Sequence, residues 1–165
     1  MGNSSSIAQM RVGELVETIG EQGLSAGAGA AGAVTLALAA ACAAKAAAIS
    51  LKHQPAQDSL RRLLDACERI GRFALAGADR DAQAFATFVR ENTLGAVAEL
   101  LREGDRLIRL IDILSDVLDR LATQVESEMA GDVVAARALM EAARKIQLTN
   151  SAEARTEQAR LKSSS

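Results

Sequence analysis

The stretch that decides the fold runs from Ser25 to Ile49 and reads SAGAGAAGAVTLALAAACAAKAAAI. Glycines open it, and alanine, the residue with the highest helix propensity, fills most of the rest. We therefore expect a helix from about Gly29 to Leu51 whose small side chains let neighbouring backbones approach closely. Such a helix is a core helix, a membrane span, or a helix whose amino end receives a ligand, because free N–H groups and the positive dipole end gather there.

The sequence around this stretch weighs against two of its possible roles. Gly27, Gly29 and Gly32 spell G-x-G-x-x-G, but no strand is predicted before them and no acidic residue follows about twenty positions on to hold a ribose. The uncharged run from Ala28 to Ala44 has 17 residues, just inside the range for crossing a bilayer. Alanine and glycine contribute little to insertion, however, so we expect a buried helix in a soluble assembly and no membrane partner. From the residues alone, close helix packing is the simplest role for the glycines.

Length and composition indicate one helical domain. The chain has 165 residues, enough to bury a core, with a net charge of −2, three Phe and neither Trp nor Tyr. We therefore expect no nucleic-acid partner, since a basic patch and stacking aromatic residues are both missing. Cys42 and Cys67 lie in apolar helical patterns, which favours buried free thiols and a reducing, cytoplasmic setting. The domain is predicted to span residues 1–165, with disorder over 1–6 and 163–165.

The pattern of apolar residues predicts an all-α, up-and-down multi-helix bundle with the alanine-rich helix at its centre. The chain has a single proline, Pro55, and no apolar run with period two. Further helices are expected at about residues 7–21, 55–89, 94–125 and from 131 on. Pro55 is expected in the first turn of the second of these, with a bend allowed at Gly71 or Gly77. The last is expected to end as a polar helix over 149–165. The helix over 94–125 carries apolar residues on opposite sides, which predicts burial in the bundle or against a second subunit, so that dimerisation through helices is expected.

Few residues carry obvious chemistry by themselves. Asp79 and Asp81 stand two positions apart on a predicted helix, where side chains do not face each other, so their spacing favours a solvated face. His53 is the only histidine and has no cysteine, histidine or carboxylate cluster beside it in the sequence. We therefore expect it on the surface and expect no metal site.

Several segments in a fixed order add a family resemblance. The loop LSAGAGA (residues 24–30) and its helix are similar to a P-T-P-G-G-G-S loop and helix, and DRDAQAF (79–85) is similar to D-x-D/E-A-E-A-F. Gly131-Asp132 is similar to an S-D helix start, and Asn150 falls near the second asparagine of an N-V-x-I-N-L segment. These motifs, over about residues 10–155, resemble the cyclodeaminase/cyclohydrolase family, which includes formiminotetrahydrofolate cyclodeaminase and methenyltetrahydrofolate cyclohydrolase.

The sequence departs from these motifs at named positions. Ala26, Ala28 and Ala30 stand where the loop motif has its second proline, middle glycine and serine. Gly131 replaces the serine of the S-D start, and Ile146 replaces the first asparagine of the last motif. A stretch that family members carry after the position of residue 92 is nearly missing.

The resemblance implies an all-helical homodimer with a folate site beside the glycine loop. The implied reaction is either ring closure of formiminotetrahydrofolate with loss of ammonia, as a lyase, or hydrolysis of the methenyl bridge, as a hydrolase. Its substrate is a tetrahydrofolate derivative, and no metal is implied. The implied catalytic residues are Asp132 first, then Asp79 and Asp81; the implied ligand-binding residues are Ser25, Gly27, Gly29, Lys52 and Asn150. The alternative is a degenerate member that keeps the helical dimer as a binding or interaction protein.

Overall fold

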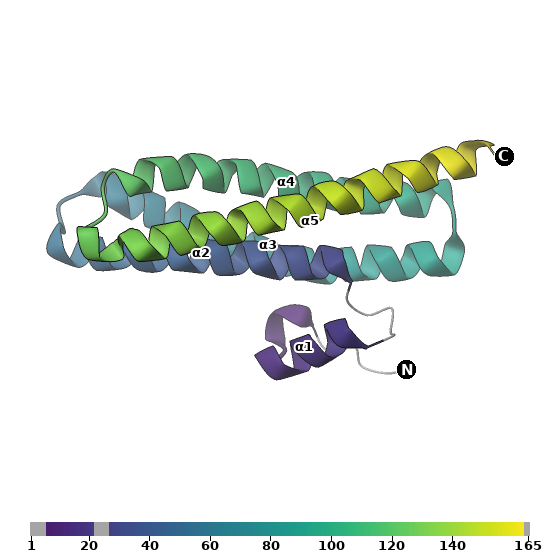
Figure 1. Ribbon diagram of the computed structural model, residues 1–165, viewed down its shortest axis with the longest axis horizontal. Coiled ribbons are helices and arrows are strands. Elements are labelled where there is room, and N and C mark those ends of the chain that lie inside the picture. Colours follow the sequence, from purple (N-terminus) through teal and green to yellow (C-terminus); the bar gives the residue numbers. More distant parts are fainter. Residues whose placement is uncertain (1–5, 22–26, 164–165) are drawn as a thin grey trace.

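The computed structural model describes residues 6–21 and 27–163, and within them the chain is all-helical. Four long helices run up and down beside one another to form a bundle (Figure 1). They are α2 (Ala28–His53), α3 (Asp58–Glu91), α4 (Leu94–Ala122) and α5 (Ala130–Ser163). The shorter elements are the 3-10 helices η1 (Ile7–Gln9) and η2 (Ser127–Met129) and the helix α1 (Val12–Gly20). The predicted all-α bundle is confirmed.

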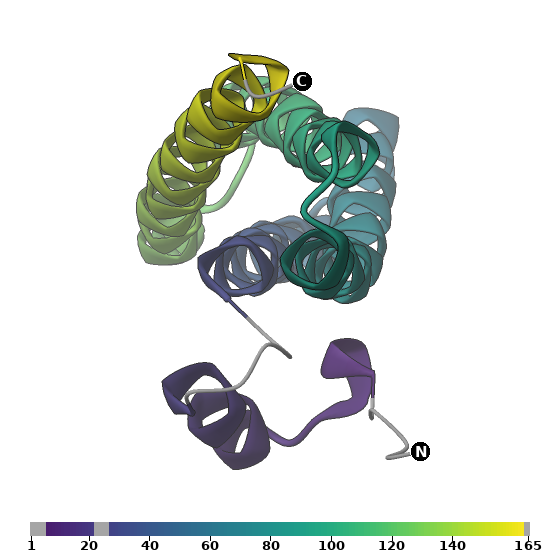
Figure 2. The ribbon, with the colours of Figure 1, turned by 90° about the vertical axis from the view of Figure 1, so that its right-hand side faces the viewer.

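The alanine-rich helix α2 packs chiefly against α3 and α5 (Figure 2). Its alanines are small enough for close contact, and a Cβ added at Gly32 would lie 2.9 Å from the Ile146 side chain of α5. By length and hydropathy, α2 is the one helix in residues 6–21 and 27–163 that could cross a membrane. Twelve of its residues are buried among the other helices, which is the pattern of a core helix.

Several helix boundaries differ from the expected ones. The first predicted helix is broken at Met10 and Arg11, whose extended backbone separates η1 from α1. Pro55 does not open α3 but lies in the turn before it, where its carbonyl accepts a hydrogen bond from Arg61. The helix α3 is continuous through Gly71 and Gly77. Gly71 faces Ala40 of α2, and Gly77 faces Leu107 of α4. The polar end of the chain continues α5 as far as Ser163.

The predicted disordered ends fall mostly outside the described residues, which begin at Ser6 and stop at Ser163. The Ser6 hydroxyl donates to a carboxylate oxygen of Asp79 at 2.7 Å, and the backbone N–H of Ile7 donates to the other oxygen at 2.6 Å. Ile7 itself is buried against the bundle. These contacts attach η1 to α3.

The expected burial of both free thiols is confirmed for Cys67 only. Cys67 of α3 is buried in the core, whereas Cys42 of α2 is half-buried and packs against the core. Burial raises the pKa of the Cys67 thiol to about 12, so it stays protonated. His53 is exposed at the carboxyl end of α2, as predicted.

Candidate functional site

A cavity of about 310 Å³ lies at the end of the bundle where α2 begins. The helix α2 has 26 residues against 34 in α3 and in α5, and both longer helices extend beyond its first residue (Figure 1). The cavity is lined by residues from the start of α2 and from three other helices: Gly27, Ala28 and Gly29; Asp81, Phe85 and Phe88 of α3; Leu100 and Gly104 of α4; and Gln147, Asn150, Ser151, Glu153 and Ala154 of α5. This volume falls at the lower end of the range of small-molecule sites, about 300–1,000 Å³.

Asp81 is the acidic group at the floor of the cavity and is only 9% exposed. Its carboxylate packs directly on the first turn of α2, where a Cβ added at Gly29 would lie 2.3 Å from Oδ2. The backbone N–H of Ala30 donates to this carboxylate. Because the first N–H groups of a helix have no partner within it, Asp81 caps α2 from the neighbouring helix.

The surroundings of Asp81 change its acidity. Burial raises the pKa of Asp81 most, and the nearby negative charge of Glu103 raises it further, while the Ala30 hydrogen bond lowers it, for a result of about 6. A carboxyl group with this pKa exchanges its proton close to neutral pH. That is the property required of a general acid or base. The spacing-based prediction of a solvated face is therefore wrong for Asp81, because α2 and α4 cover it.

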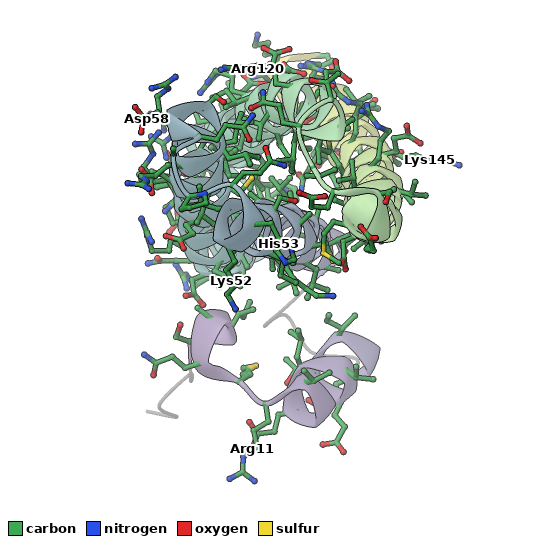
Figure 3. All side chains as sticks on the ribbon, turned by 90° about the vertical axis from the view of Figure 1, so that its left-hand side faces the viewer. Arg11, Lys52, His53, Asp58, Arg120 and Lys145 are labelled. Atoms are coloured by element: carbon green, nitrogen blue, oxygen red, sulfur yellow. The ribbon has the colours of Figure 1, made fainter. Side chains whose placement is uncertain are left out.

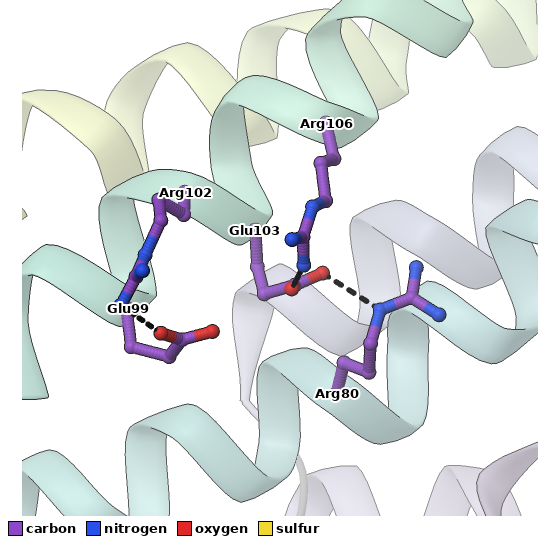
Figure 4. A network of polar contacts seen from close by, with 5 residues as sticks. All are labelled: Arg80, Glu99, Arg102, Glu103 and Arg106. Carbon is purple, nitrogen blue, oxygen red and sulfur yellow. Dashed lines mark hydrogen bonds and ion pairs between the residues drawn. The ribbon is translucent and has the colours of Figure 1, made fainter.

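Glu103 of α4 is the second buried acid at this end of the bundle, with 1% of its surface exposed. It accepts a 2.9 Å hydrogen bond from Nε of Arg80 and forms an ion pair with Arg106, as Figure 4 shows. Sequence reasoning missed Glu103. The sequence pattern could have indicated its burial, because Glu103, Leu107 and Ile111 follow one another at four-residue steps on the buried side of α4.

The α5 side of the cavity carries two buried polar residues that sequence reasoning also missed. Gln147 donates from Nε2 to the Gly29 carbonyl at 2.9 Å, which ties α5 to the start of α2. Ser151, one turn further along, is 3% exposed, and its hydroxyl has no hydrogen-bond partner among the described residues. Both continue the buried side of α5 beyond Ala143.

The structure brings together four of the residues predicted to form the site. Gly27, Gly29, Asp81 and Asn150 all line the cavity. Asp79 does not, because its carboxylate holds η1 on another side of α3. Ser25, the remaining predicted residue of the loop, lies outside the described residues.

Lys52 and Asp132 lie far from this cavity within the chain. Figure 3 views the opposite end of the bundle, where Lys52 is exposed next to His53. At about 1.5 Å per residue, Lys52 is about 35 Å along α2 from Gly29. Asp132 pairs with Lys45 at 2.9 Å, which places it about 24 Å along α2 from Gly29.

Metal ligands do not cluster in the part of the chain that the structure describes. Within residues 6–21 and 27–163, no group of three or more histidine, cysteine or acidic side chains is arranged to hold an ion. The cavity itself offers the carboxyl group of Asp81, hydrogen-bonding groups on α5, and the rings of Phe85 and Phe88.

Together, the described residues form an all-α protein whose four long helices enclose a cavity with a buried carboxyl group in its lining. The chain belongs to the formiminotransferase-cyclodeaminase family, whose model matches residues 11–153. Its fold is similar to that of formiminotetrahydrofolate cyclodeaminase from Thermotoga maritima, with a TM-score of 0.86 and 22% sequence identity. That similarity covers 90% of this chain and 80% of the other. Comparison with curated proteins gives no match.

Proposed function

We propose that this protein acts in folate one-carbon metabolism and that the cavity beside Gly29 binds a tetrahydrofolate derivative. Family membership and the similarity to a formiminotetrahydrofolate cyclodeaminase support this substrate class. The observation that carries the proposal is the Asp81 carboxyl group, held at the floor of a cavity with a pKa of about 6.

The proposed reaction forms or breaks a C–N bond at the one-carbon unit. In ring closure, N10 bonds to the formimino carbon and loses its proton, while the amine on that carbon takes up a proton, its C–N bond breaks and it leaves as ammonia. In the hydrolytic reaction, water adds to the methenyl carbon and loses a proton. The bond from that carbon to N5 then breaks as the remaining hydroxyl loses its proton to become the formyl carbonyl and N5 takes up a proton. Each route needs one group that both accepts and donates a proton near neutral pH. We assign that role to Asp81.

The other cavity residues suit a flat ring with polar edges. Two of the chain's three phenylalanines, Phe85 and Phe88, line the cavity and offer apolar faces to such a ring. Asn150 supplies both a donor and acceptor in its carboxamide. Gly27 has open space beside it and lets the ligand come close to the backbone at the start of α2.

The decisive experiment is an absorbance assay of methenyltetrahydrofolate formation and decay with the wild-type protein and Asp81→Asn. Loss of a general acid or base lowers the rate by about 10²–10⁴-fold, and we expect a reduction in that range. Asp79→Asn and Asp132→Asn are matched controls, because each removes one carboxylate outside the cavity. Wild-type turnover in Asp81→Asn would contradict the assignment, and a selective loss in Asp132→Asn would move the chemistry to the Lys45–Asp132 pair.

A second candidate function is folate binding without turnover. Ala28 and Ala30 favour it, since they replace the glycine and serine of the loop motif beside the cavity. This candidate predicts that tetrahydrofolate raises the Tm of the protein while the absorbance assay shows no rate above the uncatalysed one. If tetrahydrofolate neither turns over nor raises the Tm, both candidates fail.

We further propose a cytoplasmic homodimer. The helix α1 buries none of its own residues, and Val12 and Val16 on it are 79% and 64% exposed. Leu38 on the outer side of α2 is exposed as well. A second copy that covers these apolar side chains would bury them. Light scattering tests this proposal: a mass of twice 17.2 kDa supports it, and a mass of 17.2 kDa contradicts it.

A further inference from the structure

Ser151 stands out because it is polar, buried and without a partner. Its side chain is 3% exposed and lines the cavity, and no described group accepts from or donates to its Oγ. A buried hydroxyl without a partner costs about 1–3 kcal/mol. Each such group calls for an explanation, and a ligand in the cavity would complete the hydrogen bonds of this one.

The packing around Ser151 fixes where its hydroxyl lies. A Cβ added at Gly104 of α4 would stand 2.8 Å from Oγ, so the absence of a side chain at Gly104 makes room for this hydroxyl. Gln147, one turn earlier on α5, uses its Nε2 to hold the Gly29 carbonyl. The two residues thus differ in role, since Gln147 joins two helices and the Ser151 hydroxyl is left for the cavity.

Both polar residues also depart from the motif to which this segment is similar. When N-V-x-I-N-L is aligned on Asn150, it has valine at residue 147 and leucine at residue 151. This chain has Ala30 where the loop motif has a serine, and it carries a serine at residue 151, in the lining of the cavity. The polar side chains at residues 147 and 151 therefore give this cavity contacts that the motif residues would not provide.

We propose that the Ser151 hydroxyl is a binding contact that hydrogen-bonds the ring end of the folate. This inference rests on the proposed function. Ser151 and Asp81 are buried at the floor, whereas Asn150 is less buried and Glu153 is exposed. The ring bears nitrogen, oxygen and amino groups on its edge, and a serine hydroxyl can pair with any of them. The charged glutamate tail keeps its hydration by pointing out of the cavity to solvent.

The test measures tetrahydrofolate affinity in the wild-type protein, Ser151→Ala and Ser115→Ala. Ser115 is a half-buried serine of α4, about 16 Å along that helix from Gly104, so its variant removes a hydroxyl away from the cavity. A neutral hydrogen bond contributes about 0.5–1.5 kcal/mol, which corresponds to an affinity about 2- to 12-fold weaker in Ser151→Ala. Ser115→Ala should bind like the wild-type protein. Without ligand, Ser151→Ala should keep or raise the Tm, because it removes an unpaired polar group.

The outcomes separate this inference from the proposed function. If the wild-type protein does not bind tetrahydrofolate, the proposed function fails and the inference fails with it. If the wild-type protein binds and Ser151→Ala binds equally well, the inference alone is overturned. A lower Tm of ligand-free Ser151→Ala would also overturn it, because the hydroxyl would then have a partner within the protein.

Discussion

Gly29→Ala is the perturbation whose consequences follow most directly from the structure. A methyl group at residue 29 would lie 2.3 Å and 2.4 Å from the two carboxylate oxygens of Asp81, so the carboxylate must move away. Moving it breaks its bond to the Ala30 N–H, and a hydrogen bond to a charged group is worth about 1.5–3 kcal/mol. The higher helix propensity of alanine returns at most about 1 kcal/mol.

The net loss of stability is therefore about 0.5–2 kcal/mol, or a fall in Tm of about 1–8 °C for a domain of this size. Activity should fall by more, since a displacement of about 1 Å at a reacting group can cost about 10²-fold in rate. For the stability measurement, the matched control on the same turn is Gly27→Ala, because a Cβ there meets no described heavy atom within 4 Å. Activity is compared with the wild-type protein alone, because Gly27 lines the cavity.

A double-mutant cycle isolates the clash from any general effect of the substitution. Thermal unfolding is measured for Gly29→Ala in the wild-type and in the Asp81→Ala background. With the carboxylate gone, Gly29→Ala should keep only its gain in helix propensity, at most about 1 kcal/mol, so the coupling equals the lost hydrogen bond, about 1.5–3 kcal/mol. Gly27→Ala should show no coupling to Asp81. An equal loss of Tm from Gly29→Ala in both backgrounds would refute the contact between residue 29 and Asp81.

Three further predictions concern the same helices. Glu103→Gln removes a negative charge beside Asp81, so the pKa of Asp81 falls and the corresponding midpoint in the pH profile of kcat/KM moves to lower pH; an unchanged profile would contradict the charge coupling. Asp81 has a pKa raised from 3.8 to about 6 in the folded protein, so its contribution to stability is present below about pH 4 and is lost as the pH rises through 6. Denaturant unfolding measures the free energy of unfolding of Asp81→Asn relative to that of the wild-type protein. This relative stability should rise by about 2–3 kcal/mol from pH 4 to pH 8, and a value that does not change with pH would argue against a raised pKa. Gly71→Ala places a Cβ 3.7 Å from Ala40 in ordinary contact within a helix, so it should raise the free energy of unfolding by about 0.5–1 kcal/mol in the same assay.

The helices could be predicted from the sequence because helix formation depends on local composition and on the spacing of apolar residues. Alanine content predicted α2, and the four-residue steps of apolar side chains predicted α4. Boundaries were less certain where tertiary contacts decide them. Asp79 attaches η1 to α3 from 72 positions away, so the break between η1 and α1 has no local signal.

The site was predicted in part, for a physical reason. Motif matching found Gly29, Asp81 and Asn150, but spacing on one helix could not show that α2 and α4 bury Asp81. Glu103 and Ser151 carried a readable signal, since each is a polar residue on the buried side of its helix. What they face depends on how the helices pack, which no single helical pattern specifies.

The central claim is that a folate binds in the cavity at the start of α2, next to Asp81. The most direct measurement is a crystal structure of the protein with bound tetrahydrofolate. We predict that the ring lies in this cavity with a polar atom within hydrogen-bonding distance of the Asp81 carboxylate. A ligand bound instead beside Lys45 and Asp132, with this cavity empty, would contradict the claim.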